Sequence, residues 1–209
     1  MLGLVPSAMA DFMAAELYLG IDTASSYLAL ALYQPAQGEV AALCEPVGRG
    51  HAQRLLPALT EMLARANCER HDIAGIGVGI GPGSYTGLRV GLASAQGLAR
   101  ALNVPVCGEE SLAAMAYAQL SSGETGLVAF DARRGNVYAA RYMRHDDKVE
   151  RLDSISKQAR ETLQARYPSL CYVENAPLAA VYLAQQAAKQ ANNTSLRASQ
   201  SPAIQPLYL

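Results

Sequence analysis

The chain has 209 residues, of which 51% are hydrophobic and 17% charged, so it can bury the core of one large or two small domains. Its formal net charge of −1 at pH 7 argues against a surface built mainly to bind polyanions. The four cysteines have no metal-like spacing and three lie in or beside apolar runs, which predicts reduced, mostly buried thiols in a cytosolic protein; they are Cys44, Cys68, Cys107 and Cys171.

The first sixteen residues have an apolar character but no basic start, and Asp11 and Glu16 interrupt them, so we do not expect a secretory signal. We predict that residues 1–16 are a leader or disordered extension, because the first clear element begins at Leu17. No run approaches the roughly 18 apolar residues of a membrane helix.

Three apolar runs separated by turn residues predict a three-stranded antiparallel meander over Leu17–Ile21, Tyr27–Tyr33 and Val40–Val47. A helix is predicted from His51 to about Asn67, because leucines recur there at helical spacing. A strand over Ile73–Ile80 and a helix over Leu88–Leu102 follow. The order is therefore strand, strand, strand, helix, strand, helix.

The second half of the chain continues this mixed pattern. A strand and a helix are predicted over Val104–Cys107 and Ser111–Leu120, and a pair of strands over Leu127–Asp131 and Val137–Arg144. A helix, a strand and a helix then close the chain over Lys157–Arg166, Leu170–Val173 and Ala179–Gln190. The whole sequence thus predicts an α/β fold with no sequence repeat.

The most constrained segment is Gly81–Gly91, which joins a predicted strand to a predicted helix through Gly-Pro-Gly. Ser84 and Thr86 suit the helix start, because their hydroxyls can accept bonds from its free N–H groups. Such a start can hold an anion. It can equally be a tight connection that packs the helix on a sheet, and spacing alone favours this second interpretation. The segment is not a P-loop, since no Gly-Lys-Ser/Thr ends it.

Gly81–Gly91, together with Ile21–Ser26 and His51–Pro57, resembles the bacterial TsaB (YeaZ) family. Asp131–Tyr138 and the closing Pro206–Leu209 match the same family in the same order. The resemblance implies an actin-like ATPase (RNase H-like, ASKHA) fold, with two lobes of mixed β-sheets flanked by helices. It also implies an N-terminal lobe over residues 17–108 and a smaller C-terminal lobe over residues 109–209.

The resemblance implies a cytoplasmic, non-catalytic partner subunit of TsaD, the relative that carries the catalysis. Together they would form threonylcarbamoyladenosine beside the anticodon of tRNAs that read codons starting with A. The isolated chain would form a homodimer and need no cofactor, whereas the assembled complex, with the ATPase TsaE, uses ATP and metal. The chain would contact tRNA only as part of the complex. It would not contact a membrane. The alternative is an actin-like ATPase or peptidase active in its own right.

The turn at Asp22, Thr23 and Ser25 is a possible remnant nucleotide loop. In actin-like ATPases this position places an acid near the metal and hydroxyls near the phosphates. The alternative is a turn whose side chains satisfy its own backbone. If the loop is a remnant, ATP should bind the isolated chain no more tightly than about 1 mM.

His51 invites comparison with TsaD and its relatives, which bind metal through a His-x-x-x-His pair on one helix turn. Here Leu55 stands at the second position and cannot ligate, so we predict no metal site and assign His51 to helix capping or a subunit contact. A nucleophilic role for Ser84 or Ser25 would need a base, and none of the three histidines is placed by a motif to serve as one. No catalytic residue is therefore predicted.

Small residues recur at every fourth position after Gly83 and form a ridge, hereafter the small-residue ridge, at Gly87, Gly91, Ala95 and Ala99. Such a ridge allows close approach of another helix, either the protein's own first helix or a helix of a partner. The resemblance favours the partner. The predicted partner interface therefore comprises His51, Leu55, Leu59, Gly87, Leu88, Gly91 and Ala95.

Overall fold

The computed structural model describes residues 16–193 and 204–207, and the predicted leader over residues 1–16 lies almost wholly outside them. The described chain opens with the predicted meander: β1 (Leu17–Asp22), β2 (Tyr27–Gln34) and β3 (Gly38–Pro46) pair antiparallel. β4 (Ile73–Gly79) and β5 (Val106–Glu109) extend the sheet in parallel beyond β1. The five strands lie in the order β3-β2-β1-β4-β5, which confirms the predicted α/β class.

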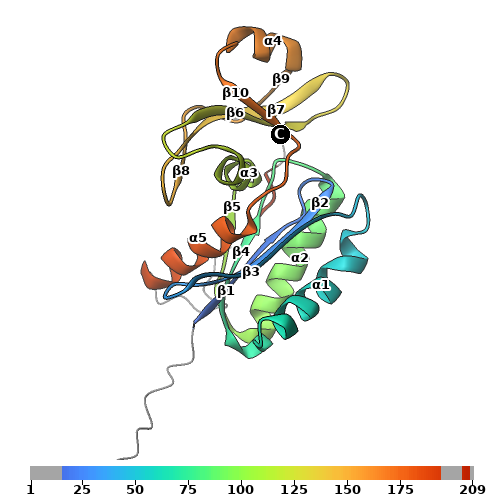
Figure 1. The fold of residues 1–209 in the computed structure, drawn as a ribbon. Helices are drawn as coiled ribbons and strands as arrows, with labels where there is room; N and C mark the ends of the chain where they lie inside the picture. The colour runs from blue at the N-terminus through green and yellow to red at the C-terminus, as the bar shows by residue number, and fades with distance from the viewer. Residues whose placement is uncertain (1–15, 194–203, 208–209) are drawn as a thin grey trace, which may run out of the picture.

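One face of this sheet is covered by α1 (His51–Arg65) and α2 (Tyr85–Leu102), and the other face by α5 (Ala180–Asn193) (Figure 1). All six residues of β1 are buried, as expected for a strand covered on both faces. α2 begins where the Ser84 hydroxyl accepts a bond from the Gly87 N–H, 3.2 Å apart. It ends at Asn103, whose left-handed φ of 56° closes the helix.

The closing helix α5 lies unusually near the first sheet. A Cβ added at Gly20 would overlap the Ala180 carbonyl, and one added at Gly77 would overlap the Leu183 carbonyl. Glycine at both strand positions therefore allows the helix backbone to rest on the sheet. The prediction that residues 109–209 form a separate lobe is wrong in this respect, because their last helix completes the first lobe.

A second five-stranded sheet forms the other lobe. β6 (Thr125–Asp131) and β7 (Asn136–Arg144) pair antiparallel, and β10 (Cys171–Glu174) runs parallel to β6. The other edge of β7 pairs with two short strands, β8 (Val149–Arg151) and β9 (Ser156–Ala159). The helix predicted over Lys157–Arg166 is therefore shorter than expected: its first residues join the sheet, and α4 covers only Arg160–Arg166.

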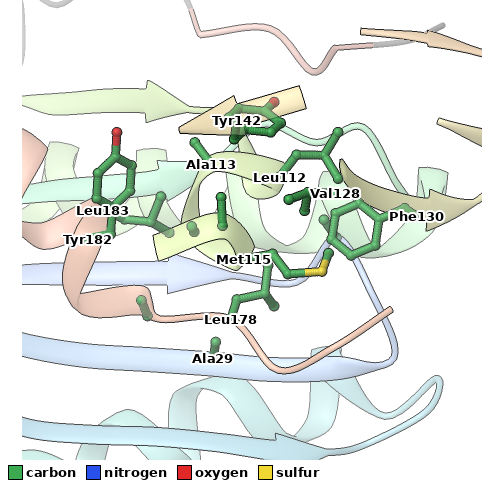
Figure 2. Close-up of a cluster of buried hydrophobic side chains, with 14 of the residues drawn as sticks. Ala29, Leu112, Ala113, Met115, Val128, Phe130, Tyr142, Leu178, Tyr182 and Leu183 are labelled. Carbon is green, nitrogen blue, oxygen red and sulfur yellow. The ribbon is translucent and has the colours of Figure 1, made fainter. Parts of the chain in front are cut away.

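The two lobes share one hydrophobic core around α3 (Ser111–Gln119), as Figure 2 shows. Six consecutive residues of this helix, Ser111 to Ala116, are buried, because the helix packs against the second sheet and α5 in a cluster that also includes Ala29 and Ala31 of β2. Side chains from β2, α3, β6, β7 and α5 meet in the cluster; they include Ala29, Met115, Phe130, Tyr142 and Leu183. Movement of one lobe against the other would have to disrupt this packing.

The cysteines differ from the prediction of mostly buried thiols. Cys107 is buried, but Cys44 and Cys171 are exposed and Cys68 is half-buried; all four are free. Cys44 lies on the edge strand β3 and Cys171 at the start of β10, so an apolar run at the edge of a sheet did not ensure burial. Among the helices of the described residues, none combines the length and apolar character needed to cross a membrane.

Candidate functional site

Asp22 is the last residue of β1 and is fully buried. Its Oδ1 accepts a bond from the Ala24 N–H at 2.8 Å, and its Oδ2 accepts one from the Ser111 hydroxyl at 2.6 Å. The same hydroxyl accepts the Gly81 N–H at 3.1 Å. Gly79 closes the remaining side, because a Cβ there would overlap Asp22 Oδ2. The carboxylate thus fastens β1, the loop after β4 and the start of α3 together.

Burial raises the pKa of Asp22 from 3.8 to about 6, although the hydrogen bonds from Ser111 and Ala24 act in the opposite direction. The folded protein therefore holds this proton more tightly than the unfolded chain does. The resulting stabilisation is complete below pH 3.8 and is lost as the pH rises through 6. An acid in this environment joins segments of the fold without projecting into the cleft between the lobes.

Thr23 and Ser25, the other residues of the possible nucleotide loop, also bond within the fold. The Thr23 hydroxyl is buried and donates to the Gly87 carbonyl at 2.7 Å. The Ser25 hydroxyl accepts the Tyr27 N–H at 3.1 Å, and this half-buried side chain lines the cleft. These bonds agree with the alternative that the sequence left open, a turn whose side chains satisfy its own backbone.

The small-residue ridge faces inward, which corrects the prediction that it forms a partner surface. A Cβ at Gly87 would overlap the Thr23 carbonyl, and one at Gly91 would overlap the Thr23 hydroxyl. Ala95 and Ala99 are buried in the core between α2 and the sheet. The ridge therefore allows the helix to approach the chain's own β1–β2 turn and strands, and neither α1 nor a partner helix is required to explain it.

The other residues of the predicted partner interface are buried as well. Leu55 and Leu59 of α1 and Leu88 of α2 are each no more than 2% exposed, and His51 is 4% exposed. Side chains this deep in a single chain cannot form the contact surface themselves. What α1 and α2 present outward instead includes Leu56, 51% exposed, and Tyr85, 57% exposed.

His51 does not cap a helix. Its Nε2 lies 3.1 Å from the Tyr27 carbonyl, which makes Nε2–H the donor, and the N-cap of α1 is Gly50, which supplies no side-chain bond. Leu55, one helix turn on, packs in the core with Leu28 and Leu30 of β2. Among the described residues there is no group of three or more His, Cys, Asp or Glu side chains close enough to hold a metal ion.

A cleft of about 620 Å³ lies between the lobes. The first lobe contributes the turn at Ala24–Ser26, the loop at Gly83–Thr86 and Arg49; the second contributes Phe130–Arg133, Tyr138 and Asn175. A smaller cavity of about 260 Å³ adjoins it at the starts of α1 and α2. Arg49 and Arg133 line both, and sequence reasoning missed them as site residues because 84 positions, 49 to 133, separate them along the chain.

We expect Asp22→Asn to flatten part of the pH dependence of stability. Between pH 4 and pH 8 the wild type should lose about 2.4 kcal/mol relative to the variant, since the pKa lies at about 6 instead of 3.8. Urea unfolding of both proteins across this range measures the difference, and any structural effect of Asn itself is independent of pH. A difference that stays constant from pH 4 to pH 8 would show that the carboxylate is not held in a desolvated site.

Comparison with known proteins gives consistent results. The family model described as TsaD, tRNA N6-adenosine threonylcarbamoyltransferase, matches residues 42–200. The tRNA threonylcarbamoyladenosine biosynthesis protein TsaB of Escherichia coli is 40% identical over 133 residues, which cover 63% of this chain and 57% of that protein. The protein of the same name from Haemophilus influenzae is 37% identical over 128 residues, covering 60% of this chain and 53% of that protein.

The alignments thus span a little over half the length of these curated relatives. The structural likeness is more extensive. YeaZ from Pseudomonas aeruginosa superposes with a TM-score of 0.76 at 25% identity, covering 93% of this chain and 100% of that structure. The mixed sheets flanked by helices are accordingly the actin-like, RNase H-like fold that the sequence predicted. The chain belongs to the family that the matching model describes, and its relatives place it among the TsaB (YeaZ) proteins of that family.

Proposed function

We propose that the chain is a cytoplasmic, non-catalytic partner subunit that binds TsaD and supports it in forming threonylcarbamoyladenosine on tRNA. The names of the TsaB relatives support the pathway. In the assembled complex, TsaD and the ATPase TsaE use the ATP and metal, and tRNA is contacted only there. In the absence of TsaD, two copies of the chain pair with each other.

The observation that carries the non-catalytic role is the position of Asp22. In an actin-like ATPase the corresponding loop presents an acid to the metal and its nucleotide. Here both carboxylate oxygens are fully buried and occupied by the Ala24 N–H and the Ser111 hydroxyl. Reaching a ligand would require breaking these bonds and moving Gly79. The acid therefore has a structural role in this chain.

The shared core supports a role as a fixed scaffold. Many actin-like enzymes close their lobes around a nucleotide, whereas here α3 is buried against the second sheet and α5, in a cluster that also includes residues of the first sheet. Closure would separate packed side chains such as Met115 and Phe130, and close-packed interiors resist such displacement. A subunit whose lobes stay fixed can hold a partner in one shape.

The outer face of α1 and α2 is the surface we assign to TsaD and, in its absence, to a second copy. The inner faces of both helices are used by the chain's own core, whereas Leu56 and Tyr85 are the large apolar side chains that these helices expose. Arg89 lies over the Tyr85 ring, 5.4 Å from its centroid, and donates to its hydroxyl at 2.9 Å. Aromatic and arginine side chains are frequent among the residues that dominate binding energy at interfaces.

Leu56→Asp tests this assignment. We expect it to weaken association with TsaD about 30-fold or more, because a charge replaces an apolar contact at the centre of the interface. Leu152→Asp is the matched control, since Leu152 is also exposed, at 37%, but lies outside α1 and α2. Co-purification with tagged TsaD and the threonylcarbamoyladenosine content of tRNA from the reconstituted reaction are the readouts.

Both variants should keep the wild-type melting temperature, because both side chains are already exposed. Retention of TsaD by Leu56→Asp would place the interface elsewhere. Hydrolysis of ATP or peptides by the purified chain alone, lost in a site variant, would instead support an enzyme acting in its own right.

A further inference from the structure

The smaller cavity has an unusual concentration of positive charge. It lies where α1 and α2 begin and where the turn after β6 reaches across from the second lobe. Arg49 lines it from the loop before α1, and Arg133 lines it from the opposite lobe. No carboxylate lies among the described residues that line this cavity.

Neither arginine has an ion pair with a carboxylate in the part of the chain that the structure describes. Other arginines of the chain do: Arg54 pairs with Glu61, and Arg141 with Asp153, each at 2.8 Å. Asp131 lines the larger cleft, but it accepts the backbone N–H of Arg133 and lies 3.4 Å from Arg160. The charges of Arg49 and Arg133 are therefore left without a counter-charge in the cavity.

The backbone adds to this potential. The 15-residue α1 and the 18-residue α2 both direct their N-terminal ends at the cavity, and neither has an acidic residue in its first turn. Each end carries a partial positive charge. The two arginines and the two helix ends therefore all favour an anion in this cavity.

We propose that this cavity binds a phosphate group without a metal ion, held between Arg49 of the first lobe and Arg133 of the second. The planar guanidinium group matches the geometry of phosphate oxygens and binds them in pairs. The turn that carries Arg133 is fixed, because Asp131 accepts its N–H at 3.1 Å and Asn136 donates to its carbonyl at 3.3 Å. The site does not use Asp22, which lines neither the cavity nor the adjoining cleft.

Two sources share this chemistry: a small phosphate compound, or the backbone of an RNA strand. The cavity itself, about 260 Å³, takes the phosphate group, and the adjoining cleft of about 620 Å³ leaves room for the rest of a ligand. The net charge of −1 argues for a single localised phosphate contact over a long basic track.

The test is calorimetric titration of the full chain with inorganic phosphate, against chloride at equal ionic strength. We expect a Kd of about 1 mM or tighter, and about a tenfold weakening in each of Arg49→Gln and Arg133→Gln. Arg134→Gln is the matched control, because Arg134 is the next residue of the same exposed turn but does not line the cavity; it should stay within about twofold of the wild type. Melting temperatures without phosphate should agree among all four proteins, since the three side chains are exposed.

A nucleoside 5′-monophosphate and a short single-stranded RNA distinguish the two sources. Tighter binding of the monophosphate than of phosphate, lost in both cavity variants, identifies a small phosphate compound. Tighter binding of the RNA, lost in the same variants, identifies a nucleic acid backbone. Absence of phosphate binding at about 10 mM would overturn the proposal. It would also be overturned if Arg134→Gln weakened binding as much as Arg133→Gln, because the attraction would then be diffuse.

Discussion

Replacing Gly91 by valine should lower the melting temperature of the isolated chain by about 6–12 °C. The added Cβ would overlap the Thr23 hydroxyl, which is buried and donates to the Gly87 carbonyl at 2.7 Å. The helix must therefore move away from the β1–β2 turn, or Thr23 must give up this bond. Overpacking of this kind costs about 3 kcal/mol at the upper end of its usual range, and each kcal/mol shifts the melting temperature of a chain this size by about 2–4 °C.

Ala93→Val is the control for this change. Ala93 lies on the same helix but is exposed, so valine there has the same branching and none of the overlap. Its melting temperature should stay within about 2 °C of the wild type. A Gly91→Val protein that melts like the wild type but no longer associates would instead return the small-residue ridge to a partner surface.

The strands and helices of the first lobe could be predicted because their signals are local. Alternation of apolar runs and turns defines β1 to β3, and leucines at helical spacing define α1. The segment at Gly81–Gly91 was also correctly placed between a strand and a helix, since Gly-Pro-Gly and the Ser84 cap form a local pattern. β8 and β9 escaped prediction because three and four residues are too few for a periodicity to show.

The neighbour against which the small-residue ridge packs could not be predicted in the same way. Glycines and alanines at every fourth position indicate close approach, but the pattern does not say what approaches. At Gly87 and Gly91 the neighbour is Thr23, a turn residue more than 60 positions earlier, as the Thr23–Gly87 hydrogen bond shows. The pattern led us to expect a helix, whereas the actual neighbours are the backbone carbonyl and the hydroxyl of Thr23.

The candidate site was only partly predictable for the same reason. The sequence identified Asp22, Thr23 and Ser25, but the bond that determines the role of Asp22 comes from Ser111, 89 residues later. The two arginines of the proposed phosphate cavity are linked by no local motif, since Arg49 precedes α1 and Arg133 follows β6. Arg49 stands between Gly48 and Gly50, a loop signal that could have drawn attention to it.

A fragment of residues 17–108, the lobe that the sequence predicted, should fail to fold by itself. The second face of its sheet is covered in the full chain by α5, whose backbone rests on Gly20 and Gly77. The buried side chains of α5 include Val181, Tyr182 and Leu183, and full burial of such a side chain stabilises by about 1.5–3 kcal/mol. Together with the missing α3, the loss is on the order of the entire stability of a domain, about 5–15 kcal/mol.

A fragment of residues 17–193 is the matched control, because it begins at the same residue, keeps α3 and α5 and omits the closing segment. Of that segment the structure describes residues 204–207, where the Leu207 N–H donates to the Ile80 carbonyl at 2.8 Å and the Ile204 carbonyl accepts from Gln96 at 3.2 Å. We expect cooperative urea unfolding and dispersed amide resonances for residues 17–193, and neither for residues 17–108. Cooperative unfolding of the shorter fragment would show that the first sheet does not need α5 to fold. The boundary near residue 108 would then mark an independent domain.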